Sequence, residues 1–226
     1  ELEFADSLKL EVAAATPAGE AFLLTTPLAE YPDLTLPLRG AHQVENAALA
    51  IRAAEHYLGR ALNPAAARAG LKAVRWPGRF QILSRRPPLV VDGAHNPAGA
   101  AILSDALERY FPGRKVVFAL GVSMGKDLNG ILDAFAGSAA GVVAVRSVHA
   151  RGESPEVVAR AARSRIRGVV EEGKDARSSL GRARRLAGPD GVGCGAGSLY
   201  LVGDVLKDWG AFRSSWEGKA PRVHHR

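Results

Sequence analysis

Hydrophobic and polar positions follow two different periods along the chain, and the first of these predicts strands. Residues 8–13 alternate, which predicts a strand, and we expect a turn at Ala18-Gly19 and a second strand at residues 21–25. Prolines interrupt the chain after the second strand, so we expect irregular edge chain there. These prolines are Pro27, Pro32 and Pro37.

The period becomes that of a helix from residue 44, where one apolar stripe runs toward Gly59, a suitable C-cap. The stripe consists of Val44, Ala47, Ala48, Ile51, Ala54 and Leu58. A second short helix is predicted to begin at Asn63-Pro64, because asparagine caps a helix well and proline suits its first position.

The run Trp76-Pro77-Gly78 breaks this pattern, and we expect it to separate a first domain, residues 1–75, from a second, residues 76–226. Strands of the second domain are predicted at residues 89–91, 116–120, 142–145, near 169–170 and at 199–202. Helices are predicted at residues 97–110, 128–135, 155–166 and 176–186, and in a last segment through Trp209. Short β-branched strands between such helices predict an α/β fold, a Rossmann-like doubly wound parallel sheet that binds ligands in the loops after its strands.

Composition limits the class of protein. With 226 residues, of which 47% are apolar, the chain is long enough for one large core or two modest ones. No apolar run approaches the roughly 20 residues of a membrane span, and the acidic start at Glu1 is unlike a signal peptide. The lone Cys194 excludes an internal disulfide framework, and we expect no metal cluster and a reducing, cytoplasmic setting.

The net charge of +7 comes from one part of the chain. Residues 1–139 contain 14 basic and 14 acidic residues, whereas residues 140–226 contain 16 and 9. We interpret the basic clusters as solvated helix faces, since few aromatic residues and no nucleic-acid motif accompany them. The clusters are Arg163, Arg165 and Arg167, and Arg182, Arg184 and Arg185.

The hexapeptide Asp92-Gly93-Ala94-His95-Asn96-Pro97 follows the first predicted strand of the second domain and opens a helix. A carboxylate at the end of such a strand can accept hydrogen bonds from both hydroxyls of a ribose, and His95 can bind phosphate or a metal or act as an oriented donor. A structural role suits the same residues equally, with Asn96 as the helix cap and Asp92 as a brace for the turn.

Two other motifs lie upstream. Arg79 ends the run Trp-Pro-Gly-Arg at the domain boundary, where its guanidinium would suit phosphate oxygens, although a loop arginine is more often a surface charge. Asn46 ends the run Gly-Ala-His-Gln-Val-Glu-Asn at the first helix. Its amide offers the donor and acceptor that an adenine edge needs, but the spacing alone favours a polar helix start.

The ordered motifs His-Gln-x-x-Asn, Trp-Pro-Gly-Arg and Asp-Gly-Ala-His-Asn-Pro resemble those of folylpolyglutamate synthase and the related bifunctional dihydrofolate synthase, of the Mur ligase superfamily. The resemblance runs from about residue 20 to the carboxyl end. It implies that residues 1–75 are the tail of a central ATPase domain and that residues 76–226 are the Rossmann-like ligase domain.

The resemblance also implies a chemistry. Enzymes of this family use ATP to phosphorylate a folate or dihydropteroate carboxylate, and the amine of glutamate then attacks the acyl phosphate. The expected cofactors are ATP and Mg²⁺, held mostly by an amino-terminal ATPase domain. The resemblance further implies a monomeric enzyme of folate biosynthesis and one-carbon metabolism. From the apolar runs and the charge pattern we expect it to bind neither membranes nor nucleic acid.

Residue roles follow from position in the motifs. The resemblance implies that Asn46 contacts adenine, that Arg79 contacts phosphate and that Asp92 contacts the ribose. His95 would lie in the catalytic cleft. Ser198, which we expect at the start of the last strand, would hold the carboxylate of the incoming glutamate, although a plain turn residue at a strand edge fits it equally.

One run departs from the family. Asp-Lys-Asp usually follows the second strand of this domain, whereas the chain has Met124-Gly125-Lys126-Asp127. Lys126 and Asp127 remain as candidate catalytic residues, with Lys126 expected to face the phosphates. The first acid is replaced by Gly125.

The chain contains no phosphate-binding loop. Residues 121–127 are one residue short of Gly-x4-Gly-Lys-Ser/Thr and end in Asp. Residues 193–197 are glycine-rich but precede the predicted last strand, so we interpret them as a flexible loop. We therefore expect a fragment that needs its amino-terminal ATPase domain as a partner and does not turn over ATP alone.

Two other hypotheses remain open at this point. A sister Mur-type ligase that acts on a cell-wall precursor would share the chemistry and differ in its acceptor. A non-catalytic Rossmann-like binding module would use the basic carboxyl-terminal part to meet an acidic partner, and its binding would weaken with salt.

Overall fold

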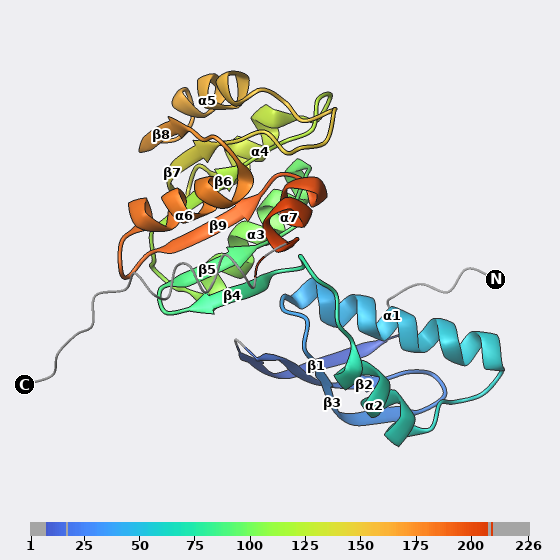
Figure 1. The fold of residues 1–226 in the computed structure, drawn as a ribbon. Helices are drawn as coiled ribbons and strands as arrows, with labels where there is room; N and C mark the ends of the chain where they lie inside the picture. Colours follow the sequence, from blue (N-terminus) through green and yellow to red (C-terminus); the bar gives the residue numbers. More distant parts are fainter. Residues whose placement is uncertain (1–7, 17, 208, 210–226) are drawn as a thin grey trace, which may run out of the picture. The chain divides into compact units, whose positions relative to one another are not determined.

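The computed structural model describes residues 8–16, 18–207 and 209. It divides the chain into two compact units, residues 1–80 and residues 81–226. Unit 1 is built on a three-stranded antiparallel sheet with two helices, and unit 2 on a six-stranded, mostly parallel sheet with five helices (Figure 1).

Unit 1 begins with three strands in the order β1-β2-β3, which are β1 (Lys9–Thr16), β2 (Gly19–Thr25) and β3 (Glu30–Leu36). The prediction of irregular chain around the prolines is wrong, because β3 occupies this segment. Tyr31 and Leu34 are fully buried and hold β3 against the core. Pro32 is tolerated because β3 is an edge strand, where a missing backbone N–H need not break a ladder.

The two helices of unit 1 are α1 (Ala41–Leu58) and α2 (Pro64–Ala73). Gly59 ends α1 in the left-handed conformation with φ of 65°, and Asn63 Oδ1 accepts the N–H groups of the first turn of α2, as predicted. The apolar stripe of α1 is buried from Val44 to Ile51. Leu58, at its end, is 46% exposed, and Glu55 takes the last buried position instead.

Glu55 is a fully buried carboxylate that joins several elements of unit 1. Its Oε1 accepts hydrogen bonds from Thr26 Oγ1 at 2.9 Å and from the Tyr31 hydroxyl at 2.6 Å, and its Oε2 lies 3.3 Å from Arg52 Nη1. The Tyr31 hydroxyl in turn accepts the N–H of Leu62 at 2.8 Å. Burial, together with the bond to Glu55, raises the pKa of Tyr31 above its usual range.

The variant Tyr31→Phe is expected to lower the free energy of unfolding by about 1–3 kcal/mol, because the buried Glu55 loses a donor and Leu62 loses an acceptor. Urea unfolding followed by circular dichroism measures this difference. Tyr57→Phe is the matched control, since Tyr57 is 89% exposed on α1 and its change should leave the midpoint in place. Equal midpoints for the two variants would contradict the expected role of this cluster.

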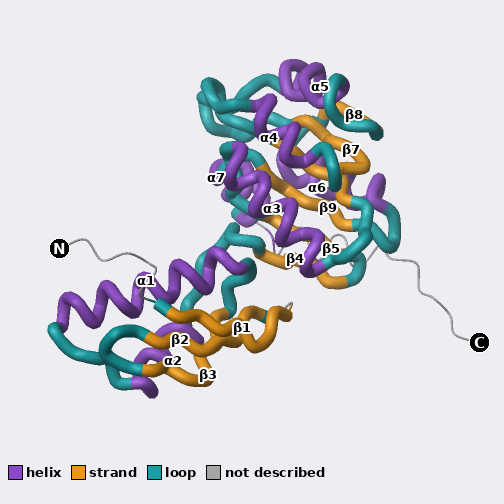
Figure 2. Tube along the Cα trace, turned by 180° about the vertical axis from the view of Figure 1, so that it is seen from behind, coloured by secondary structure: helices purple, strands orange, loops and turns teal. Residues whose placement is uncertain are grey.

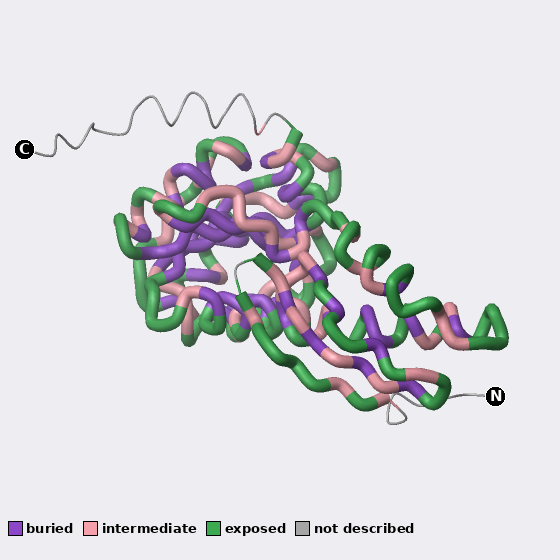
Figure 3. The backbone as a smooth tube through the Cα atoms, turned by 90° about the horizontal axis from the view of Figure 1, so that it is seen from below, coloured by how far each residue is buried: buried purple, intermediate pink, exposed green. Residues whose placement is uncertain are grey.

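The sheet of unit 2 has the strand order β4-β5-β9-β6-β7-β8. All neighbours are parallel except β4 and β5, which form an antiparallel hairpin at one edge. The strands are β4 (Gln81–Arg85), β5 (Pro88–Val91), β6 (Val116–Leu120), β7 (Ala139–Ala144), β8 (Val169–Glu172) and β9 (Val192–Ala196). The central strands are buried throughout (Figure 3).

Helices cover both faces of this sheet, which confirms the predicted doubly wound α/β fold (Figures 1 and 2). One face carries α3 (Pro97–Tyr110), α4 (Leu128–Phe135) and α5 (Pro155–Arg163), which pack in sequence order. The other carries α6 (Ala176–Ala187) and α7 (Leu199–Leu206), whose Leu180 and Leu201 join the core with Val91, Val117 and Val143.

The carboxyl-terminal elements differ from those predicted. The glycine-rich segment is not a flexible loop but the buried central strand β9, and the predicted strand at residues 199–202 lies in α7, which ends at Leu206. Gly193 explains the composition of β9, since a Cβ there would lie 2.9 Å from both the Arg184 Cα and a Leu89 methyl. The strand is poor in β-branched residues because α6 packs against its backbone.

Candidate functional site

The loops after three strands of unit 2 meet at the carboxyl edge of its sheet. The backbone N–H of Asp92, after β5, donates to Gly195 O at 2.9 Å, and that of Gly121, after β6, donates to Ala196 O at 3.1 Å. Gly197, after β9, donates to Ala94 O at 2.8 Å. Strands β5 and β6 lead to helices on one face and β9 to a helix on the other. This edge is therefore a topological switch point, where open α/β sheets bind ligands.

The hexapeptide after β5 has a structural partner for each of its polar side chains. Asp92 is half-buried, and its Oδ1 accepts the N–H of Ala94 at 2.7 Å. His95 Nδ1 lies 2.8 Å from Gly93 O, and since a carbonyl only accepts, Nδ1 carries the hydrogen and Nε2 is left as an acceptor in the neutral ring. Asn96 caps α3 as expected. These bonds fix Asp92 and His95 at the edge of the sheet.

The loop after β6 brings Lys126 and Asp127 to the same edge. Asp127 caps α4, with its Oδ1 accepting the N–H of Gly130 at 2.9 Å, while Lys126 is exposed. The first turns of α3 and α4 touch, since a Cβ on Gly130 would lie 2.7 Å from the Cγ of Pro97. Gly125, which replaces the acid of the family, has φ of 79°, a conformation that favours glycine.

Ser198 lies at this edge too, but in a different element from the one predicted. It is the N-cap of α7, not the first residue of a strand, and its Oγ accepts the N–H of Tyr200 at 3.1 Å. The side chain is buried. The position results from β9 ending at Ala196, with Gly197 making the turn into the helix at φ of 104°.

Asn46 and Arg79 lie in unit 1, where both line one cavity of about 330 Å³. Gln43 is the third polar residue of its lining, and Trp76 contributes an indole that is 61% exposed. The rest of the lining is aliphatic and consists of Leu36, Leu38, Ala47, Ala50, Leu71 and Val74. Trp76 was not among the predicted contacts. The signal that could have identified it is the aromatic side chain within the Trp-Pro-Gly-Arg motif.

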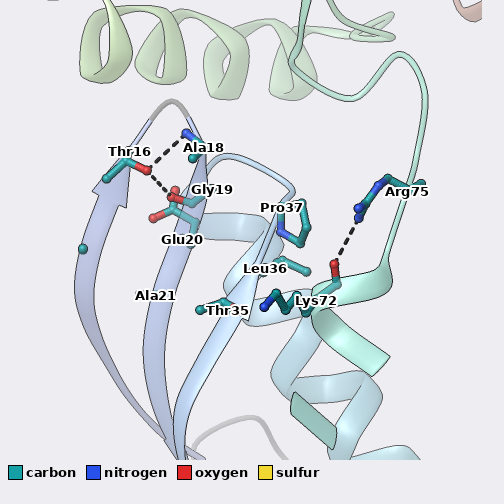
Figure 4. A pocket seen from close by; sticks show the side chains of 11 residues that line it. Thr16, Ala18, Gly19, Glu20, Ala21, Thr35, Leu36, Pro37, Lys72 and Arg75 are labelled. Carbon is teal, nitrogen blue, oxygen red and sulfur yellow. Dashed lines mark hydrogen bonds between the residues drawn. The ribbon is translucent and has the colours of Figure 1, made fainter. Parts of the chain in front are cut away.

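A larger cavity of about 490 Å³ opens in unit 1 between the ends of β1 and β2 and the end of α2 (Figure 4). Thr16, Lys72 and Arg75 are among its polar lining residues, and Arg75 donates to Lys72 O at 3.0 Å. It contains none of the predicted site residues. The smaller cavity is the better candidate site, because it combines an aromatic ring, an amide and a guanidinium.

The predicted residues thus fall into two groups. Asp92, His95, Lys126, Asp127 and Ser198 lie at one edge of unit 2, and Asn46 and Arg79 lie in one cavity of unit 1.

Two negative findings apply to the part of the chain that the structure describes. Within it, no three His, Cys, Asp or Glu side chains gather as metal ligands would. Its helices are also too short or too polar to cross a membrane.

Three arginines of the basic clusters of unit 2 are paired with acids, and the first, Arg163, lies 3.6 Å from Glu172. Arg165 lies 3.0 Å from Asp133, and Arg182 forms two bonds of 2.7 and 2.8 Å to Glu171. The pairing with Arg182 lowers the pKa of Glu171.

Comparison with known proteins gives a consistent result. The family model described as Mur ligase, glutamate ligase domain matches residues 78–199. A dihydrofolate synthase/folylpolyglutamate synthase of Mycobacterium tuberculosis is 39% identical over 140 residues, which are 60% of this chain and 29% of that protein. A probable bifunctional folylpolyglutamate synthase/dihydropteroate synthase of Haloferax volcanii is 33% identical over 183 residues, which are 80% of this chain and 21% of that protein.

A solved structure is similar over most of the chain. The Mycobacterium tuberculosis folylpolyglutamate synthase complexed with ADP and AMPPCP matches 89% of this chain with a TM-score of 0.81 and 32% identity. The match covers 48% of that structure's chain. This chain therefore spans about half the length of the solved relative and less than a third of each curated one.

Proposed function

Because the chain belongs to the Mur ligase family, we propose that it is the carboxyl-terminal portion of an ATP-dependent ligase that adds glutamate to a folate or dihydropteroate carboxylate. In this reaction a carboxylate oxygen attacks the γ-phosphorus of ATP and releases ADP. The amine of glutamate then attacks the acyl carbon, and phosphate leaves. The acyl phosphate makes the carboxylate oxygen a leaving group that an amine can displace.

The observation that carries this proposal is the cavity shared by Asn46, Arg79 and Trp76. Ligand sites combine apolar walls with a few placed polar groups, and this lining fits a purine nucleotide. The indole of Trp76 offers a surface on which a base can stack, the amide of Asn46 meets the edge of the base, and the guanidinium of Arg79 meets phosphate oxygens.

The carboxyl edge of unit 2 supplies the other contacts. Asp92 accepts hydrogen bonds from the ribose hydroxyls, and Lys126 offers a cation to the phosphates. His95 has its ring fixed by Gly93, so its Nε2 is left as an acceptor for a ligand at this edge. Ser198 accepts the N–H of Tyr200, which leaves its own hydroxyl hydrogen to be donated to the carboxylate of glutamate.

Among the described residues, no three His, Cys, Asp or Glu side chains gather as metal ligands would. Asp127 is committed to capping α4. We expect Mg²⁺ and the phosphate-binding loop to be supplied by the amino-terminal ATPase domain, since no Gly-x4-Gly-Lys-Ser/Thr run occurs among the 226 residues.

The chain alone is expected to release no ADP above background when it is incubated with ATP, Mg²⁺, glutamate and either dihydropteroate or folate. A separately expressed amino-terminal ATPase domain should restore turnover, because it brings the missing phosphate-binding groups. Coupled detection of ADP measures both. Clear turnover by the chain alone would contradict the division of the active site, and restored turnover only with a cell-wall precursor as acceptor would replace the folate assignment.

A further inference from the structure

Unit 1 contains a hydrogen-bonded series of side chains that ends at the proposed adenine contact. We propose that His42 and Gln43 are positioning residues that orient the amide of Asn46, so that the cavity selects a 6-amino purine over a 6-oxo purine. This inference rests on the proposed function, because it concerns the base of the nucleotide that unit 1 would hold.

The contacts of the series lie within the first turns of α1. Gln43 Nε2 lies 3.0 Å from His42 Nε2, and Asn46 Nδ2 lies 3.5 Å from Gln43 Oε1, a longer and weaker bond. Gln43 and Asn46 both line the cavity that contains Trp76 and Arg79. The series therefore leads from His42 to the wall where a base would bind.

The direction of each hydrogen bond in the series determines the direction of the next one. An amide NH₂ only donates, so the bond to His42 requires an unprotonated Nε2 and turns the Gln43 oxygen toward Asn46. That oxygen only accepts, so Asn46 must face it with Nδ2. The Asn46 Oδ1 is then left to meet the ligand as an acceptor.

An acceptor at this place distinguishes two kinds of purine. The 6-amino group of adenine donates a hydrogen bond to it, whereas the 6-oxo group of hypoxanthine brings a second acceptor against it. A site that binds a donor rejects the analogue that lacks one, because a polar group is left unpaired.

The start of the series is fixed by a buried carboxylate on β2. Glu20 is 2% exposed, and its Oε1 accepts the N–H of Gly40 at 3.1 Å. Gly40 has φ of 108°, and a Cβ there would lie 2.7 Å from the imidazole of His42. The ring of His42 thus lies directly against a backbone turn that Glu20 holds in place.

The test compares the binding of ADP and IDP to the 226-residue chain by equilibrium dialysis. The two nucleotides differ in the 6-substituent and in the hydrogen that N1 carries in the 6-oxo purine. We expect the parent chain to bind ADP about tenfold or more tightly than IDP, the effect of one unpaired polar group. Gln43→Leu should bring the two affinities within about threefold of each other, since the Asn46 amide can then turn. Gln43→Glu keeps an acceptor toward Asn46 and should retain the preference.

Glu45→Gln is the matched control, because Glu45 is exposed on the same turn and does not line the cavity. Its ratio of affinities should equal that of the parent chain, and urea midpoints will show that all variants fold. An unchanged ratio in Gln43→Leu, with ADP still bound by the parent chain, overturns the positioning role alone. Failure of the parent chain to bind either nucleotide overturns this inference together with the nucleotide role of unit 1.

Discussion

Replacing Asp92 by alanine is expected to lower the kcat/KM of the reconstituted enzyme for ATP by roughly 10²–10³-fold. A hydrogen bond to a charged group contributes about 1.5–3 kcal/mol, and a ribose offers two hydroxyls to this carboxylate. The assay combines the chain with a separately expressed amino-terminal ATPase domain and follows ADP release.

The control separates ribose binding from bracing of the turn. Asp92 Oδ1 accepts the N–H of Ala94, and an asparagine can keep that bond while it gives up the charge. Asp92→Asn should therefore fold as the parent chain does and lose only about tenfold in kcat/KM. Retention of full activity by Asp92→Ala would remove the ribose role, and equal losses in both variants would assign the whole effect to charge.

Gly197→Ala is expected to destabilise unit 2 by about 3 kcal/mol or more. Gly197 has φ of 104°, which is strained for any other residue, and a Cβ there would lie 2.8 Å from the carbonyl oxygen of Gly121. Strain and overpacking each contribute about 1–3 kcal/mol, and the Gly121 backbone together with a Leu120 methyl leaves little room to relax. Urea unfolding measures the change in the free energy of unfolding.

Gly203→Ala in α7 provides the opposite result from the same chemical change. No atom outside the local helix lies within 4 Å of a Cβ at Gly203, and its backbone is helical. Alanine there should raise the stability by about 0.5–1 kcal/mol. If both alanine variants shift the urea midpoint in the same direction, the close approach of the loops after β6 and β9 is not what requires glycine at position 197.

Local signals predicted most of the fold because they act within a few residues. The asparagine before α2 and the glycine after α1 have the capping geometry that their types favour. Strands β3, β4 and β9 were missed, and at β3 and β9 tertiary packing overrides propensity. Pro32 is acceptable only because β3 lies at a sheet edge, and Gly193 belongs to a strand only because α6 packs against it.

The candidate site was predictable as motifs but not as geometry. Sequence order alone placed Asp92 and His95 at the end of a strand, where the structure has them. Ser198 was assigned to a strand because the apolar run after it has no period that separates a short strand from a buried helix. Trp76 and the bonds around Gln43 depend on how α1, α2 and the linker fold together, which spacing does not reveal.

Two backbone hydrogen bonds join the loops after β6 and β7. Met124 N donates to Arg151 O, and Glu153 N donates to Val122 O, both at 2.8 Å. Side chains on these loops can therefore change without loss of the bonds that keep the loops together. A frame of this kind separates the backbone shape of this edge from the side chains that it carries.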